Sequence, residues 1–134
     1  MKKEQITALN VAKFLQVKYP KVIYRFDLVA DMPLSIFQAN RNKALHGRFS
    51  KGYPDLFIAV CRGGYGGLYL ELKADDSTPF KKDGTLKKNE HLEMQNNRHE
   101  QLREAGYYVA FAVGFKQSVE IIEKYMEFKI KNTV

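Results

Sequence analysis

The sequence contains a single cysteine, Cys61, and no tryptophan. One cysteine cannot form a disulfide framework or a cysteine-based zinc site, and this usage is typical of a reducing compartment. No run reaches the roughly 18 consecutive apolar residues of a membrane-spanning helix, and the basic N-terminal residues precede no apolar signal core. We therefore expect a cytoplasmic protein that does not associate with membranes. We interpret Cys61, which lies in an apolar run, as a small core residue.

Acidic residues are also scarce: 15 Asp and Glu stand against 22 Lys and Arg, which leaves a net charge of +7. A basic balance favours phosphate-rich partners through counterion release, although many basic proteins bind no nucleic acid. Residues 38–52 contain no acid and residues 80–88 contain one. The predicted nucleic-acid contacts in these two stretches are Arg41, Lys43, Arg48, Lys51, Lys81, Lys82, Lys87 and Lys88. For any one of them, the alternative of a solvated loop residue is the commoner outcome.

The length and the 45% apolar fraction are typical of one globular domain, which would span residues 1–134. Apolar periodicity and turn residues predict helices over residues 3–18, 90–105 and 115–130, with a shorter one around 35–45 in the long connection 30–52. The predicted strands are the apolar runs 21–28, 56–61, 68–72 and 107–113. Pro20 ends the first helix, Gly106 closes the third, and Ser118 is the candidate N-cap of the last. The predicted class is therefore α/β.

A β-hairpin is predicted between Asp55 and Lys73, because four glycines separate the two apolar runs. If the chain reverses around residues 64–65, Asp55 lies roughly opposite Lys73. Side chains two apart on a strand share a face, so Glu71 and Lys73 point the same way. The alternative interpretation is a solvated face on which Glu71 and Lys73 are surface charges and Asp55 only begins a strand.

Charges in the middle of apolar strands are costly unless they are paired or bound to a metal. We therefore favour a divalent-metal site in which Asp55 and Glu71 hold Mg²⁺ or Mn²⁺ and several waters stay on the ion. In that interpretation Lys73 orients the attacking water and stabilises developing phosphate charge.

Pro54-Asp55 followed by Glu71-Leu72-Lys73 resembles the motif of the PD-(D/E)XK nuclease superfamily. Lys51-Gly52-Tyr53-Pro54-Asp55-Leu56 and the later Gln95 resemble its VRR-NUC branch, the virus-type replication-repair nucleases, which includes stand-alone phage and bacterial proteins of this size. The resemblance extends from Glu4 to about Val113. It implies a restriction-endonuclease-like αβββαβ core, with a mixed central sheet flanked by helices and an extra C-terminal helix.

The resemblance also implies roles for individual residues. The main-chain carbonyl of Leu72 would be a further metal ligand beside Asp55 and Glu71. Gln95 would contact the metal-bound water or the nucleic-acid backbone, and Glu4 in the first helix would face the metal site.

Apart from the resemblance, the spacing of Leu92, Gln95, His99 and Leu102 places Gln95 and His99 on the inward face of the third helix. His99, Asp27, Asp75 and Asp76 are weaker candidates for the same site. The commoner alternatives are a satisfied, half-buried histidine for His99 and an ordinary strand-end acid for Asp27.

The expected function is metal-dependent endonucleolytic hydrolysis of DNA, selective for flaps, forks or Holliday junctions in replication, repair or recombination. Symmetric cutting of a four-way junction would need two active sites and hence a homodimer. Two alternatives remain open from the sequence. One is a catalytically inactive DNA-binding accessory protein on the same fold, and the other is an unrelated structural α/β protein.

Overall fold

The computed structural model describes residues 2–28 and 33–130, so residues 30–32 of the predicted long connection lie outside the described part. A four-stranded sheet runs through it in the order β1-β2-β3-β4. The strands are β1 (Tyr24–Phe26), β2 (Leu56–Ile58), β3 (Leu68–Lys73) and β4 (Tyr108–Val113). The first three strands pair antiparallel, whereas β3 and β4 run parallel. The sheet is therefore mixed, as predicted.

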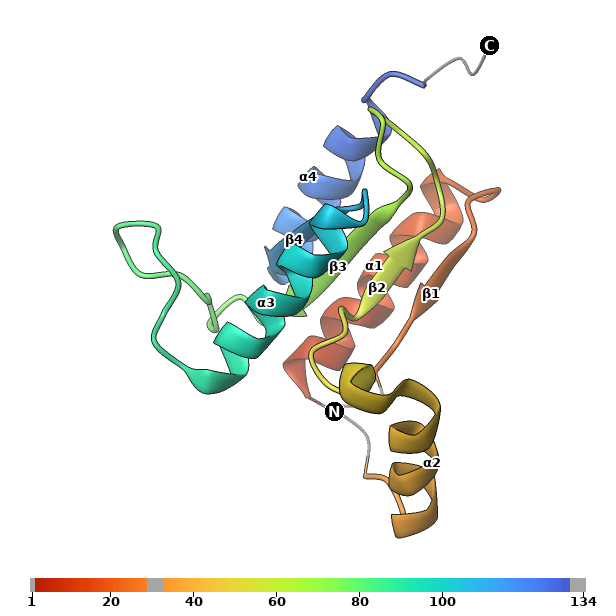
Figure 1. Ribbon diagram of the computed structural model, residues 1–134. Coiled ribbons are helices and arrows are strands. Elements are labelled where there is room, and N and C mark those ends of the chain that lie inside the picture. The colour runs from red at the N-terminus through yellow and green to blue at the C-terminus, as the bar shows by residue number, and fades with distance from the viewer. Residues whose placement is uncertain (1, 29–32, 131–134) are drawn as a thin grey trace.

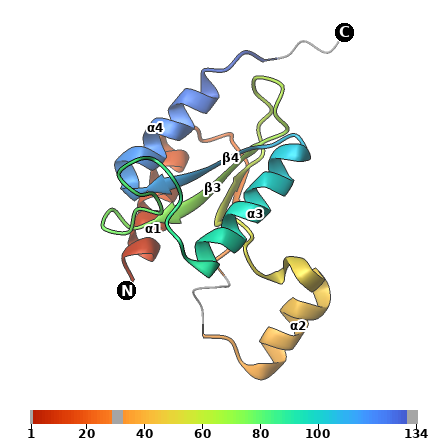
Figure 2. The ribbon, with the colours of Figure 1, turned by 60° about the vertical axis from the view of Figure 1, so that its left-hand side comes forward.

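Three helices cover the two faces of this sheet, with α1 (Lys3–Lys18) and α4 (Gly114–Met126) behind it and α3 (Glu90–Glu104) in front (Figures 1 and 2). The helix α2 (Ile36–His46) and the short 3₁₀ helix η2 (Gly47–Ser50) project away from the sheet (Figure 1). The predicted α/β class and the predicted order of elements are confirmed. None of the described helices combines the length and apolarity needed to cross a bilayer.

The main core lies between the sheet and the pair α1 and α4. On β3, Leu68, Leu70 and Leu72 alternate with Tyr69, Glu71 and Lys73, and every residue of the strand is buried. The three leucines belong to the same buried cluster as Val11 and Leu15 of α1 and Ile122 of α4. Because successive strand residues point to opposite faces, Glu71 and Lys73 are left on the α3 side. Each buried leucine contributes roughly 1.5–3 kcal/mol to this packing.

Helix boundaries follow local signals where these are strong. Ser35 caps α2 through a capping box with Gln38, and Asn89 caps α3 by accepting bonds from two backbone N–H groups. Gly106 follows α3 with a φ of 101°, which suits the predicted terminator. The prediction for Ser118 is wrong. It lies buried inside α4, which starts at Gly114, and its hydroxyl donates to the Gly114 carbonyl at 2.7 Å.

Two strands and the last helix are shorter than predicted. β1 and β2 have three residues each, and α4 ends at Met126 instead of residue 130. Cys61 is exposed and not part of the core, because the chain leaves the sheet after Ile58 and Cys61 lies in the hairpin connection. That connection turns at Gly63–Gly64, where both φ angles are positive.

The hairpin register also differs from the prediction. Leu56 pairs with Leu70, and Ile58 pairs with Leu68. Continued by one residue, this register places Asp55 opposite Glu71 and not opposite Lys73. The shift occurs because the turn lies nearer Gly63 than the predicted midpoint, and it brings the two carboxylates closer than the sequence suggested.

Candidate metal centre

Two charged side chains lie buried on the α3 side of β3. Glu71 is 2% exposed and Lys73 is 8% exposed. The strand alternation directs both away from the leucine core, and α3 then covers them. Burial of charged groups in this setting requires polar partners, which neighbouring elements provide.

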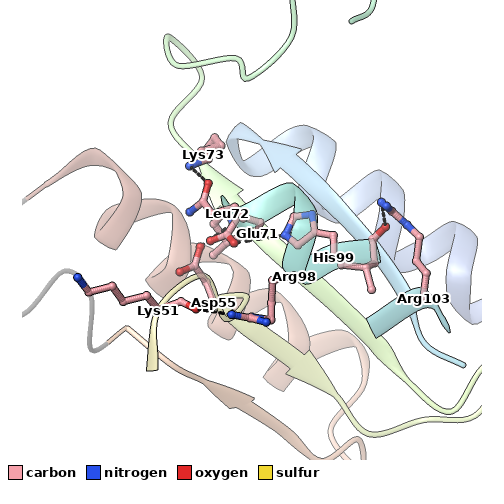
Figure 3. Close-up of polar contacts among 10 residues, drawn as sticks. Lys51, Asp55, Glu71, Leu72, Lys73, Arg98, His99 and Arg103 are labelled. Carbon is pink, nitrogen blue, oxygen red and sulfur yellow. Dashed lines mark hydrogen bonds and ion pairs between the residues drawn. The ribbon is translucent and has the colours of Figure 1, made fainter. Parts of the chain in front are cut away.

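Asp55, immediately before β2, joins this pair. Its Oδ2 accepts a hydrogen bond of 2.7 Å from the backbone N–H of Leu72, so its carboxylate is held against β3 between Glu71 and Lys73. Figure 3 shows the Asp55 and Glu71 side chains next to one another beneath α3. The structure therefore brings the two predicted metal ligands to one side of the sheet.

Lys73 is held from α3. Its Nζ donates to the Oε1 of Gln95 at 2.9 Å, and both side chains are buried (Figure 3). The predicted inward position of Gln95 on the third helix is confirmed, and its contact is with the lysine. Because an ammonium has three donors, this bond leaves Lys73 able to contact other groups in the cleft.

His99, one turn after Gln95, contacts Glu71. Its Nε2 lies 3.4 Å from Glu71 Oε1, and its ring packs 4.5 Å from the Phe111 ring. Burial, with smaller effects of Arg103 and Lys73, lowers the pKa of His99 to about 4. The contact is therefore a hydrogen bond from a neutral imidazole and not an ion pair at neutral pH. Nδ1 finds no partner among the residues that the structure describes.

A cleft of about 450 Å³ opens beside these groups. Its wall includes Asp55, Glu71, Lys73 and Gln95, and Glu4 reaches it from the first turn of α1. Lys2 and Lys3 line the same cleft. No local pattern in the sequence distinguishes these two lysines from the rest of the basic N-terminal stretch.

The donor set of the cleft suits a hard divalent cation. Asp55 and Glu71 supply carboxylate oxygens, and the Leu72 carbonyl remains the predicted third ligand. Within residues 2–28 and 33–130, no three His, Cys, Asp or Glu side chains group closely enough to hold a metal ion. Glu4 therefore lines the cleft without completing a three-carboxylate cluster. Two carboxylates with main-chain and water oxygens fit Mg²⁺, which keeps several of its waters in protein sites.

The weaker acidic candidates lie at the edge of this site or outside it. Asp76 is exposed at the rim of the cleft and pairs with Lys3 at 2.5 Å. Asp75 is also exposed, and its Cβ lies against Gly114. Asp27 approaches through the backbone, since its N–H donates to the Asp55 carbonyl at 2.7 Å.

The two predicted basic stretches project on either side of the end of β3 (Figure 1). The first comprises α2, η2 and Lys51, and we call residues 36–51 the α2 arm. The second is the connection 74–89 between β3 and α3. All eight predicted basic contacts are exposed: Arg41, Lys43, Arg48, Lys51, Lys81, Lys82, Lys87 and Lys88.

Sequence reasoning missed Arg98, which fastens the α2 arm to α3. Its Nη2 donates to the carbonyls of Arg48 and Lys51 at 3.2 and 3.4 Å, and its guanidinium lies 4.4 Å from the centre of the Phe49 ring (Figure 3). The available signal was its spacing, because Arg98 lies three residues after Gln95 and hence near the same helix face.

Comparison with known proteins finds similarity to solved structures and to no family model or curated protein. A solved structure described as "VRR_NUC domain protein" is similar over 100% of this chain and 96% of its own, with a TM-score of 0.65 and 20% sequence identity. This similarity shows that the chain has the fold of that protein, which is the fold that the sequence motif predicted.

Proposed function

We propose that the protein is a Mg²⁺- or Mn²⁺-dependent endonuclease that hydrolyses phosphodiester bonds in DNA. The observation that carries the proposal is the convergence of Asp55, Glu71 and Lys73 on one cleft, with Asp55 immediately before β2, Glu71 on the adjacent β3, and the lysine held by Gln95. The fold shared with a VRR-NUC domain protein supports it. The intact acid and lysine set argues against the alternative of an inactive DNA-binding accessory protein.

Asp55, Glu71 and the Leu72 carbonyl would hold the cation, which would lower the pKa of a bound water and neutralise charge on the scissile phosphate. Asp55 is oriented by the Leu72 N–H, and Glu71 by the neutral His99. Gln95 keeps the Lys73 amine at the cleft. From there Lys73 positions the attacking water and stabilises the charge that develops in the transition state.

The substrate we propose is branched DNA: a flap, a fork or a four-way junction in replication, repair or recombination. The α2 arm and the lysines of the connection 74–89 would hold DNA strands on both sides of the cleft through phosphate contacts. Such contacts position DNA without reading its sequence. Cleavage of a four-way junction on two strands would use a homodimer, which predicts second-order dependence of paired cuts on protein concentration. A panel of single-stranded, duplex, flap, fork and junction DNA tests this selectivity.

Plasmid nicking with Mg²⁺ or Mn²⁺ tests the catalytic assignment. Lys73→Ala and Asp55→Asn should each slow nicking by at least about 100-fold, the scale of losing one group that stabilises a transition state. Lys116→Ala is the matched control, because Lys116 is an exposed lysine of α4 that does not line the cleft. Equal nicking by all four proteins would reject the proposed site.

Titration with Mn²⁺ separates a nuclease from a binding protein that lacks a metal site. Calorimetry should show binding to the wild type that Asp55→Asn and Glu71→Gln both weaken. If the wild type binds DNA yet takes up no Mn²⁺ at millimolar concentration, the accessory-protein alternative is correct.

A further inference from the structure

A second cavity, of about 470 Å³, adjoins the metal cleft and has no role in the hydrolysis proposed above. It lies between the α2 arm and the β1–β2 side of the sheet. Gly52 and Tyr53 line both the cavity and the cleft, so the two are neighbours. Asp27, which also lines the cavity, donates its backbone N–H to the Asp55 carbonyl at 2.7 Å. A residue of the cavity therefore contacts Asp55 directly, just before β2 begins.

Four aromatic residues line this cavity: Phe26, Phe49, Tyr53 and Phe57. The Phe26 ring itself packs against the core, so the rings available to a ligand are those of Phe49, Tyr53 and Phe57. Phe49 is 48% exposed and Tyr53 is 39% exposed. Large apolar groups left in water around a concave site are a typical feature of ligand-binding surfaces. The four rings come from β1, η2, the segment before β2, and β2 itself, so only the folded chain brings them together.

Each ring is supported by another group. Tyr53 shares a hydrogen bond of 2.8 Å between its hydroxyl and that of Tyr69, and Phe57 packs 4.5 Å from the Tyr69 ring. Phe49 lies under the Arg98 guanidinium, and Phe26 packs edge-on to Tyr24 at 5.8 Å. Rings held in place lose little conformational freedom when a ligand stacks on them, and this preorganisation favours binding.

Polar groups complete the lining. Asn42, the one half-buried residue of α2, lines the cavity beside His46, and Arg25 and Asp27 contribute from the β1 segment. Amide, imidazole, guanidinium and carboxylate groups offer both donors and acceptors, which base edges require. Residues 33–54 contain no acid, so the neighbouring surface also suits a phosphate backbone.

We propose that this cavity binds one unpaired DNA base beside the phosphate that is cut in the metal cleft. Bases inside a duplex are stacked and paired, so aromatic side chains reach only bases that are unpaired or flipped out. The cavity thus gives a physical reason for preferring branched DNA, in which unpaired nucleotides lie next to duplex. The inference rests on the proposed function, which it refines by naming the feature of the substrate that the protein recognises.

Binding to three fluorescent DNAs of one sequence tests the proposal, with EDTA present to prevent cleavage. The first DNA is fully paired, the second has a one-nucleotide bulge, and the third has the same bulge without its base. Wild type should bind the base-containing bulge about ten-fold more tightly than the abasic bulge, the scale of one base–aromatic stack. Fluorescence anisotropy at fixed salt measures the three affinities.

Variants of the cavity should bring the ratio of the two bulge affinities close to one. Affinity for the fully paired DNA is measured beside it, so that a general loss of binding by the α2 arm is separated from loss of the preference. Phe49→Ala removes a ring, Phe49→Leu retains apolar volume without an aromatic face, and Asn42→Leu removes an amide. Phe37→Ala is the matched control, since Phe37 is an 83% exposed ring on the same arm that does not line the cavity. The control should keep the preference.

Equal wild-type affinity for the two bulges would overturn the proposal, as would an equal loss of preference in Phe37→Ala and Phe49→Leu. Glu71→Gln distinguishes this inference from the nuclease proposal. It should retain the preference for the base-containing bulge while losing cleavage. A wild type that shows the preference but never cuts would reject only the nuclease activity, and one that cuts without the preference would reject only the base site.

Discussion

The buried centre beneath α3 and the α2 arm are both polar, yet they are built in opposite ways. Glu71, Lys73, Gln95 and His99 are almost inaccessible to solvent and contact one another. No residue of α2, from Ile36 to His46, is buried, and Ile36 and Phe37 are among the most exposed apolar side chains of the described chain. Helices of this length are marginal without tertiary packing. The centre is thus suited to precise chemistry, whereas the arm offers surface to a partner.

The largest expected difference is between the packed core and the α2 arm in their contribution to the free energy of unfolding. Leu70→Ala should lower the free energy of unfolding by about 2–5 kcal/mol, because it leaves a cavity in the packed core under β3. Phe37→Ala on the arm should change it by less than about 0.5 kcal/mol, as is usual for exposed positions. Urea unfolding followed by circular dichroism measures both. A Phe37→Ala loss as large as that of Leu70→Ala would mean that the arm is packed in solution.

The second largest effect expected is a pH dependence of folding stability that arises from His99 in the buried centre. The folded-state pKa of His99 is about 4, below its ordinary value of 6.5. Between these values the unfolded chain binds a proton that the folded chain does not, so stability falls as pH drops from 6.5 towards 4. The loss should be on the order of 3 kcal/mol at most, since one pKa unit corresponds to about 1.4 kcal/mol.

Comparison of wild type with His99→Gln isolates this contribution, because other groups that titrate there remain in both proteins. Urea unfolding at pH 7, 6, 5 and 4 without metal should give a shallower decline for His99→Gln. His46→Gln on the exposed arm is the control and should follow the wild-type curve. Parallel curves for all three proteins would show that His99 titrates normally.

The smallest effect is expected for single basic residues of the α2 arm, which should contribute modestly to DNA affinity. Arg48→Ala and Lys51→Ala should each weaken DNA binding similarly across sequences and reduce the slope of log affinity against log salt by about one. Lys116→Ala, on a different surface, should leave the slope unchanged. Anisotropy titrations from 50 to 200 mM salt measure it, and unchanged slopes for both arm variants would remove the arm from the DNA interface.

Local signals in the sequence predicted much of the fold and several positions of the site. α1 begins and ends where its apolar period and Pro20 placed it, and α3 has Gln95 and His99 on its inward face as the spacing predicted. Glu71 and Lys73 share a face because strand alternation permits nothing else. These predictions held because each depends on the geometry of a single element.

Predictions that depend on contacts between elements were less successful. The hairpin register follows from packing as well as turn residues: a side chain at Gly67 would collide with the Phe57 ring, only 2.5 Å from the position of a Cβ. Ser118 resembles a cap in sequence, but α4 starts four residues earlier because β4 runs straight into it. The spacing of Arg98 from Gln95 indicates its helix face, but no local pattern indicates its contacts with residues 48–51, which are about 50 positions away in the chain.

By itself, the sequence determined the order of the elements, the basic character of the two flanking stretches, and the carboxylate and lysine groups that the strands carry, because periodicity and side-chain chemistry are local properties. Only the tertiary structure decided that Asp55 lies opposite Glu71, that Gln95 and His99 contact Lys73 and Glu71, and that four distant aromatic residues line one cavity. Such contacts depend on register and on how helices pack across a sheet, and these arise from many weak interactions between segments far apart in the chain.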